Sequence, residues 1–213
     1  MSTATTVAFV PQSVILRNTS WETYVRLRDE RENDHIRMTY DQGTLELMSP
    51  LSLHEWFHRL TAKHIDVLTM ELGIPIRSGG STTFRSEDLK RGLEPDECFY
   101  IFHEPSVRGK DDLDLSIDPP PDLAIEVDVT RSSKAKMAIY AALGVPELWR
   151  YDGEEILVFL LDAQGNYQRS ETSLNLPMLP IADLKRFLDM RGSFDETTLL
   201  IMFRDWVRAT LAM

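Results

Sequence analysis

The amino-acid sequence predicts a mixed α/β fold, in which helices flank a central sheet. The first observation is the order of its segments, since stretches of helical periodicity alternate with short strand-like stretches. The second is a strongly apolar strand, residues 122–129, followed at once by a helix, residues 133–143. Such a strand is typical of the interior of an α/β sheet. The third is a composition of 43% hydrophobic and 27% charged residues, which is typical of a folded globular protein.

The first third of the chain predicts a helix, a hairpin and a second helix. Thr19 or Ser20 can cap a helix over residues 21–31. Residues 37–48 alternate as a hairpin with Asp41-Gln42-Gly43 at its turn. A helical stripe of apolar side chains then extends to Gly73, where the helix ends.

The middle of the chain predicts most of the central sheet. We expect strands near residues 74–85 and 97–102, an exposed charged loop over residues 108–118, and the apolar strand 122–129. Ser132 or Ser133 caps the helix that follows, and Gly144 stops it.

The last third predicts further strands and two closing helices. Residues 147–151 form a strand, and 156–161 pairs with 167–171 as a hairpin. Helices are expected near 181–190 and 194–210, and the second is apolar enough to pack on the sheet or to form a dimer contact.

Bulk properties limit the class of protein. At 213 residues the chain fits one domain, with a core over about 20–171 and a C-terminal helical extension over about 180–213. We find neither a bilayer-spanning apolar run nor a secretory signal. Cys98 is the only cysteine, which excludes an internal disulfide and is consistent with a reducing cytoplasm. The formal net charge of −11 argues against a general electrostatic attraction to nucleic acid, but it leaves a local one open.

Strand 122–129 has one apolar face and one acidic face. The residues of the acidic face are Asp122, Glu126 and Asp128. Carboxylates so placed repel one another and are costly to desolvate unless a cation pairs with them. A divalent metal with a nearby ammonium group satisfies them, and Lys134 and Lys136 follow on the next helix.

A second acid extends this pattern. Glu94-Pro95-Asp96 opens the neighbouring strand, so Asp96 is expected beside the acidic strand. Lys136 shares a helix face with Tyr140, four residues later. Two carboxylates on adjacent strands and a lysine supply what metal-assisted phosphodiester hydrolysis requires. The spacing alone fits equally well a surface of paired carboxylates and lysines.

The segments around these residues resemble the Uma2 family, a member of the PD-(D/E)XK nuclease superfamily. The similar segments are Glu94-Pro95-Asp96, Pro121 to Val127, Lys136 to Ala141, Gly144 to Trp149 and, at the N-terminal side, Gly43 to Pro50 with His54. The resemblance covers roughly residues 21–171. It implies a restriction-endonuclease-like fold, a Mg²⁺ requirement (with Mn²⁺ as the possible substitute) and cleavage of DNA.

Carried over residue by residue, the resemblance implies a catalytic and metal-binding set. Asp96 matches the first aspartate and Glu126 the second acidic residue, and the carbonyl of Val127 is a further metal ligand. At the usual lysine position this chain has Asp128, and the resemblance places the lysine on the helix at Lys136. Glu46 and Asp122 are second choices; for Glu46, an exposed hairpin carboxylate is an equally good interpretation.

His54-Glu55-Trp56-Phe57-His58 is a literal H-E-x-x-H, the pattern of many zinc peptidases. No histidine extension follows, and no third ligand is evident. A chance match on an amphipathic helix is the better interpretation.

The sequence thus favours a cytoplasmic, Mg²⁺-dependent DNA endonuclease, a hydrolase acting on phosphodiester bonds. A homodimer would suit a two-stranded substrate. The alternative is a catalytically inactive module that keeps the nuclease fold and binds DNA or protein.

Overall fold

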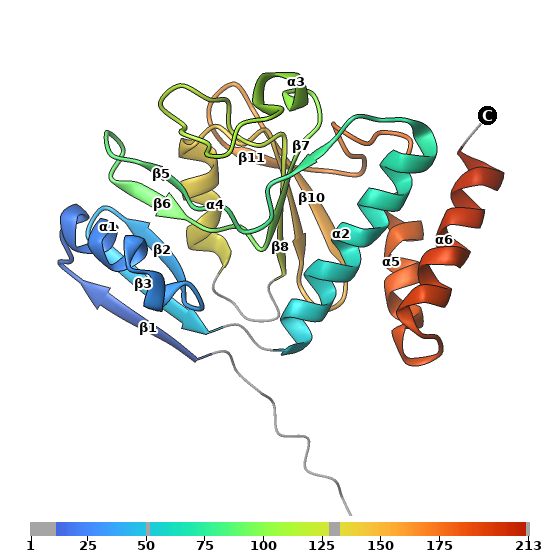
Figure 1. Ribbon diagram of the computed structural model, residues 1–213, viewed down its shortest axis with the longest axis horizontal. Coiled ribbons are helices and arrows are strands. Elements are labelled where there is room, and N and C mark those ends of the chain that lie inside the picture. Colours follow the sequence, from blue (N-terminus) through green and yellow to red (C-terminus); the bar gives the residue numbers. More distant parts are fainter. Residues whose placement is uncertain (1–11, 50–51, 128–132, 212–213) are drawn as a thin grey trace, which may run out of the picture.

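The computed structural model describes residues 12–49, 52–127 and 133–211, and the side chains of 13–49, 55–127 and 136–211. These residues form two sheets with helices packed around them (Figure 1). The mixed α/β fold, with a mixed central sheet flanked by helices, is therefore confirmed.

The N-terminal sheet is antiparallel and has the order β1-β3-β2-β6-β5. Its strands are β1 (Gln12–Arg17), β3 (Thr44–Ser49), β2 (Arg37–Asp41), β6 (Arg91–Leu93) and β5 (Phe84–Ser86). Gln42 and Gly43 join β2 to β3 with φ angles of +46° and +98°. Positive φ at both positions is what a tight hairpin turn needs, so the predicted turn is confirmed.

Helix α1 (Trp21–Asp29) packs on this sheet and is followed by the short helix η1 (Arg31–Asn33). The backbone N–H of Thr23 donates to the Ser20 hydroxyl (3.2 Å), so Ser20 is the N-cap. The aromatic rings of Tyr24 and Tyr40 stack between helix and sheet, with centroids 4.9 Å apart. This contact gives the N-terminal sheet a small core of its own.

The central sheet is mixed and has the order β11-β10-β9-β8-β7-β4. Its strands are β11 (Tyr167–Ser170), β10 (Ile156–Leu161), β9 (Glu147–Tyr151), β8 (Leu123–Val127), β7 (Glu97–Tyr100) and β4 (Arg77–Ser78). Only β8 and β9 run parallel among these described pairs, and helix α4 (Ser133–Ala142) lies between them in the chain. Gly144, at φ +78°, follows α4 and turns the chain towards β9.

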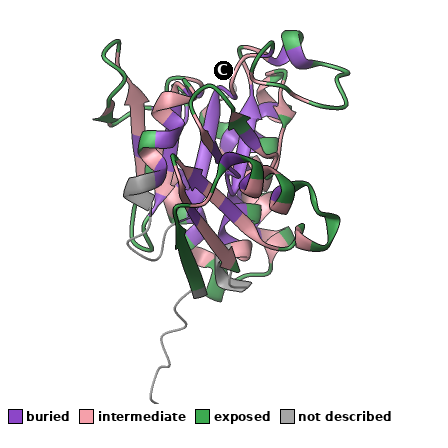
Figure 2. Cartoon of the chain, turned by 90° about the vertical axis from the view of Figure 1, so that its left-hand side faces the viewer, coloured by how far each residue is buried: buried purple, intermediate pink, exposed green. Residues whose placement is uncertain are grey.

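The two faces of the central sheet are covered differently. Helices α2 (Ser52–Leu72), α5 (Ile181–Asp189) and α6 (Glu196–Thr210) bury one face with the main core, which includes Leu123, Ile125 and Val127 of β8. Helix α4 covers the other face, where Ala124 contacts a second core cluster. Figure 2 shows the buried residues concentrated along these strands. The alternation predicted for β8 is confirmed.

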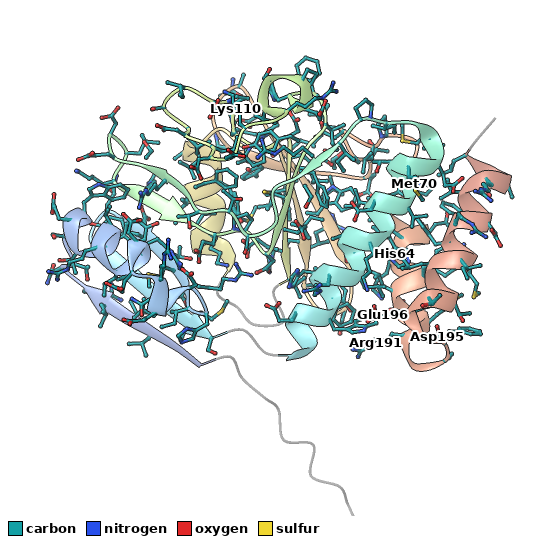
Figure 3. The ribbon with its side chains drawn as sticks, viewed as in Figure 1. His64, Met70, Lys110, Arg191, Asp195 and Glu196 are labelled. Carbon is teal, nitrogen blue, oxygen red and sulfur yellow. The ribbon has the colours of Figure 1, made fainter. Side chains whose placement is uncertain are left out.

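Helix α6 lies along α2, as Figure 3 shows on the side of the molecule that carries His64 and Glu196. Lys63 pairs with Glu196 at 2.5 Å, and Arg208 pairs with Glu71 at 2.6 Å. The short helix η2 (Met190–Gly192) follows α5. None of the described helices is long and apolar enough to cross a membrane.

The structure also contains elements that the sequence did not predict, namely β1, β6 and the short helix α3 (Glu104–Val107). The single strand predicted near residues 74–85 is wrong, because β4 and β5 are two short strands in different sheets. The charged loop after α3 is not exposed throughout, because Asp118 is only 7% exposed. Its carboxylate accepts from the backbone N–H of Asp114 (2.9 Å) and from Lys110, which is labelled in Figure 3. These bonds explain why the aspartate is buried.

Candidate active site

Asp96 and Glu126 lie side by side where β7 begins and β8 ends. In the antiparallel register Glu97 faces Ile125, so the preceding residue, Asp96, comes opposite Glu126. Residues directly opposite on antiparallel strands share a face of the sheet. The backbone N–H of Val127 donates to Asp96 Oδ2 at 2.7 Å, which fixes Asp96 against the end of β8. The two acids are therefore neighbours on one face, as predicted.

Helix α4 places two donors on Glu126. Lys136 Nζ donates to Glu126 Oε2 at 2.7 Å, and the Tyr140 hydroxyl donates to Oε1. Lys136 and Tyr140 are one helical turn apart, so both project from the same side of α4 onto the sheet. Glu126 is 2% exposed and Lys136 is 8% exposed, so the cluster is shielded from water.

Burial governs the electrostatics of this cluster. It raises the pKa of Glu126, and the nearby charge of Asp96 raises it further, while Lys136 opposes the shift. For Lys136, burial disfavours the ammonium form, but Glu126 and Asp96 outweigh this effect and the pKa is raised. Lys136 is thus an ammonium group at neutral pH, which suits charge neutralisation and not proton abstraction.

The second-choice acids lie in different places. Glu46, on β3, also raises the pKa of Lys136, so it acts on this cluster from the N-terminal sheet. Asp122 lies at the other end of β8, where its carboxylate accepts from the backbone N–H groups of Ile101 (2.7 Å) and His103 (2.8 Å). Through these bonds Asp122 anchors the backbone that connects β7 to α3. Asp128 lies outside the described residues, and so does the side chain of Lys134.

A cavity of about 440 Å³ opens beside Asp96. It lies between α2 and the β4–β7 edge, and Glu97, His58 and Asp66 also line it. The cations on its wall are Arg37, Arg59 and Lys63. A cleft with a buried acid and cations on its wall can hold a phosphate chain despite the overall negative charge.

The H-E-x-x-H segment lies on α2 at this cavity. His58 Nε2 is hydrogen-bonded to Glu55 Oε2 at 2.8 Å, whereas a zinc peptidase needs that glutamate as a base beside the metal. The side chain of His54 lies outside the described residues. Within the described part of the chain, no group of three histidine, cysteine or acidic side chains could hold a metal. The zinc interpretation therefore gains no support.

Asp96 and Glu126 nevertheless fit a magnesium ion by the chemistry of their donors. Mg²⁺ prefers oxygen ligands and is commonly held by one or two carboxylates with water completing its shell. These two carboxylates and the carbonyl of Val127 are such oxygens. In this structure Lys136 neutralises Glu126.

Sequence reasoning missed two features of this region. One is the hydrogen bond from Tyr140 to Glu126. Its only signal in the sequence is that Tyr140 follows Lys136 by four residues and so shares its helix face. The sequence presents Glu94 as part of a motif, but in the structure it is a buried residue that holds two neighbouring segments together. Its carboxylate pairs with Arg28 at 2.9 Å and accepts from the backbone N–H of Met38 at 3.1 Å.

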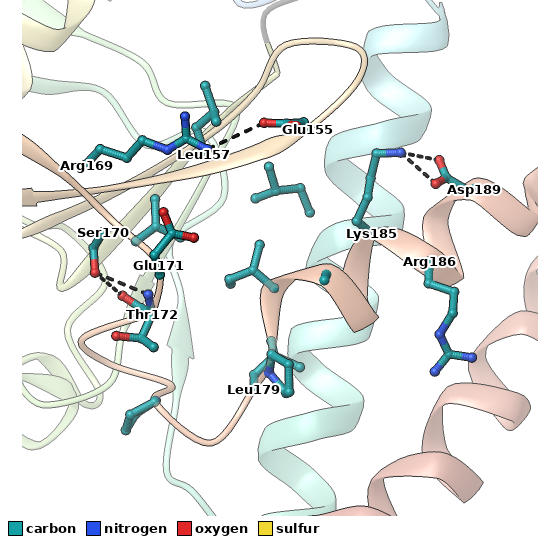
Figure 4. Close-up of a pocket in the computed structure, with 16 residues that line it drawn as sticks. Glu155, Leu157, Arg169, Ser170, Glu171, Thr172, Leu179, Lys185, Arg186 and Asp189 are labelled. Atoms are coloured by element: carbon teal, nitrogen blue, oxygen red, sulfur yellow. Dashed lines mark hydrogen bonds and ion pairs between the residues drawn. The ribbon is translucent and has the colours of Figure 1, made fainter.

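A second cavity, of about 720 Å³, lies far from these acids, between β10, β11 and α5 (Figure 4). Its cations are paired with neighbouring acids, since Lys185 contacts Asp189 at 2.5 Å and Arg169 contacts Glu155 at 3.5 Å. The cavity holds none of the predicted site residues, so we do not assign the chemistry to it.

The chain is similar to one family of proteins and to several solved structures. The family model described as "Uma2: Putative restriction endonuclease" matches residues 21–190. A crystal structure of a "putative nuclease belonging to DUF820" from Anabaena variabilis is 13% identical, with a TM-score of 0.48, and the match covers 86% of this chain and 98% of that one. Comparison with curated proteins gives no match.

Proposed function

The chain belongs to the Uma2 family, and we propose that it is a Mg²⁺-dependent endonuclease that hydrolyses phosphodiester bonds of DNA. The observation that carries this proposal is the cluster on one face of the central sheet. Asp96 and Glu126 come opposite each other there, and the Lys136 ammonium lies 2.7 Å from Glu126. Few structural needs call for two buried, adjacent carboxylates, because each costs desolvation energy.

Each residue has a distinct role in this proposal. Asp96 and Glu126, with the Val127 carbonyl, hold the ion. When bound, Mg²⁺ supplies a Lewis acid that offsets charge on the phosphodiester. Lys136 orients the attacking water and neutralises negative charge on the phosphoryl oxygens. The expected products carry a 5′-phosphate and a 3′-hydroxyl.

The cavity beside Asp96 supports DNA as the substrate. Arg37 and Arg59 lie on its wall, and such cations bind the phosphate backbone without reading sequence. A two-fold dimer, which would present two such sites to the two strands, remains part of this proposal.

Nicking of supercoiled plasmid in the presence of Mg²⁺ tests the proposal. We expect the wild-type protein to nick, Asp96→Asn and Glu126→Gln to lose at least about 100-fold in rate, and chelation of the metal to stop the reaction. Asp118→Asn is the matched control, since Asp118 is also a buried acid paired with a lysine but lies outside the cavity.

Two results would contradict the proposal. Equal nicking by the wild type and Asp96→Asn would point to a contaminant or another site. Binding of DNA by a folded wild-type protein that never cleaves it, with Mg²⁺ or Mn²⁺, would favour the alternative of an inactive nuclease-fold module.

A further inference from the structure

The carboxylate of Glu126 is held by two different kinds of donor. Lys136 donates to Oε2 and Tyr140 to Oε1, so both oxygens are engaged. Each oxygen keeps a further lone pair, so a cation can bind this carboxylate while its donors hold its orientation.

The two donors differ in how firmly they are fixed. Tyr140 is fully buried, and its ring belongs to the core cluster of Ala124, Ile139 and Leu148. The ammonium of Lys136 stands on a flexible four-carbon chain and is 8% exposed. It also repels an entering cation. Lys136 is therefore the more mobile of the two donors, and Tyr140 is the fixed one.

The hydroxyl of Tyr140 has a role that core packing alone does not explain. A phenylalanine ring would fill the same space in this apolar cluster but would leave Oε1 of Glu126 without this donor. Among the described residues, the hydroxyl forms its hydrogen bond with Glu126.

We infer that Tyr140 is a positioning residue for the metal-binding carboxylate, an inference that rests on the proposed function. Its hydroxyl holds Oε1 of Glu126 in a constant orientation, so that the carboxylate does not rotate when a cation binds or when the ammonium of Lys136 moves. Loss of such a supporting hydrogen bond typically weakens metal binding 10- to 100-fold.

Tyr140→Phe tests this inference, because it keeps the ring and removes only the hydroxyl. We expect its dissociation constant for Mn²⁺, measured by electron paramagnetic resonance, to rise by about 10-fold or more. We also expect kcat for plasmid nicking to fall while KM for DNA stays at the wild-type value. The melting temperature checks that the variant is folded.

Tyr167→Phe is the matched control. The Tyr167 hydroxyl donates to the backbone carbonyl of Val145 at 2.7 Å and packs beside the same core cluster, but it does not touch Glu126. It should keep wild-type Mn²⁺ affinity. Glu126→Gln should abolish Mn²⁺ binding, and it gives the reference value for complete loss of binding.

The outcomes separate this inference from the proposed function. Wild-type Mn²⁺ affinity in Tyr140→Phe, with binding lost in Glu126→Gln, would overturn the role of Tyr140 alone. Equal losses in Tyr140→Phe and Tyr167→Phe would reduce the effect to general destabilisation and overturn it too. Absence of Mn²⁺ binding in the wild type would overturn both.

Discussion

At the scale of single residues, the buried acids of this protein differ in their partners. Asp122 accepts backbone N–H groups, and Glu147 accepts from the Trp149 indole at 2.6 Å and from Asn175. Asp122 also pairs with His103 Nδ1 at 2.5 Å, and all these donors fix loops and strands in place. Glu126 instead faces Asp96 and is held by a lysine and a tyrosine. A second acid and an ammonium on a flexible chain suit a carboxylate that binds a cation.

His64 provides a prediction on pH. Its ring is fully buried on α2, its Nδ1 bonds the Leu60 carbonyl at 2.7 Å, and its Nε2 has no partner among the described residues. Burial lowers the pKa of His64 to about 4. The unfolded state, with a histidine pKa near 6.5, therefore binds more protons between these values, so stability falls as the pH drops through this window.

The contribution of His64 is about 3 kcal/mol between pH 7 and pH 4, at about 1.4 kcal/mol per pKa unit. Chemical denaturation at several pH values should show that the free energy of unfolding of His64→Leu falls less than that of the wild type between pH 7 and pH 4. This holds whatever the absolute stability of the variant. His35→Gln, at an exposed histidine, is the control and should keep the wild-type slope. Parallel slopes for His64→Leu and the wild type would disprove this assignment.

At the scale of elements, local chemistry predicted most helices and strands. The β2–β3 turn, the alternation of β8 and the glycine ends of α2 and α4 all follow from sequence patterns. Strand β1 could not be predicted, because Val14, Ile15 and Leu16 are exposed on both faces of an edge strand and show no alternation. The strand patterns predicted that Asp96 and Glu126 lie on neighbouring strands, and the family resemblance assigned them to the site. The Tyr140 contact depends on how α4 packs on the sheet, which spacing does not give.

Glu94, directly after β6, joins helix α1 and strand β2 of the N-terminal sheet, so its loss should weaken the N-terminal part. The Arg28–Glu94 pair is buried, with side chains 8% and 6% exposed, and Thr83 also donates to Glu94 at 3.0 Å. Glu94→Gln leaves Arg28 without this counter-charge. We expect a loss of about 3–5 kcal/mol in the free energy of unfolding, measured by denaturant titration.

The matched control for Glu94 is the exposed pair between Arg85 and Asp29, at 2.7 Å with side chains 38% and 54% exposed. Asp29→Asn should cost less than about 1 kcal/mol, because solvent screens this pair. Similar losses in both variants would mean that the buried Arg28–Glu94 pair stabilises the protein no more than an exposed pair does.

At the scale of the whole molecule, a strongly acidic protein carries three cations beside four acids on the wall of the cleft next to Asp96. The net charge is −11, yet Arg37, Arg59 and Lys63 lie on the wall of the cavity beside Asp96. DNA should therefore bind through a few local phosphate contacts. Composition alone indicated weak attraction to nucleic acid, and only the folded arrangement reveals where the cations gather.

Arg59 tests this local binding. Arg59→Gln should weaken DNA binding uniformly across sequences and lower the slope of log K against log salt by about 1, since one phosphate contact is lost. Fluorescence anisotropy with labelled duplex DNA measures both quantities. Arg108→Gln, an exposed arginine paired with Glu104 after α3, should change neither. An unchanged slope in Arg59→Gln would place the DNA elsewhere.

The most direct test of the account is the position of a bound cation. Crystals soaked in Mn²⁺ and measured at the manganese absorption edge give that position from the anomalous signal. We predict one peak within about 2.5 Å of a carboxylate oxygen of both Asp96 and Glu126. A peak held by His58 and Glu55 instead, or no peak in crystals of protein that cleaves DNA, would contradict it.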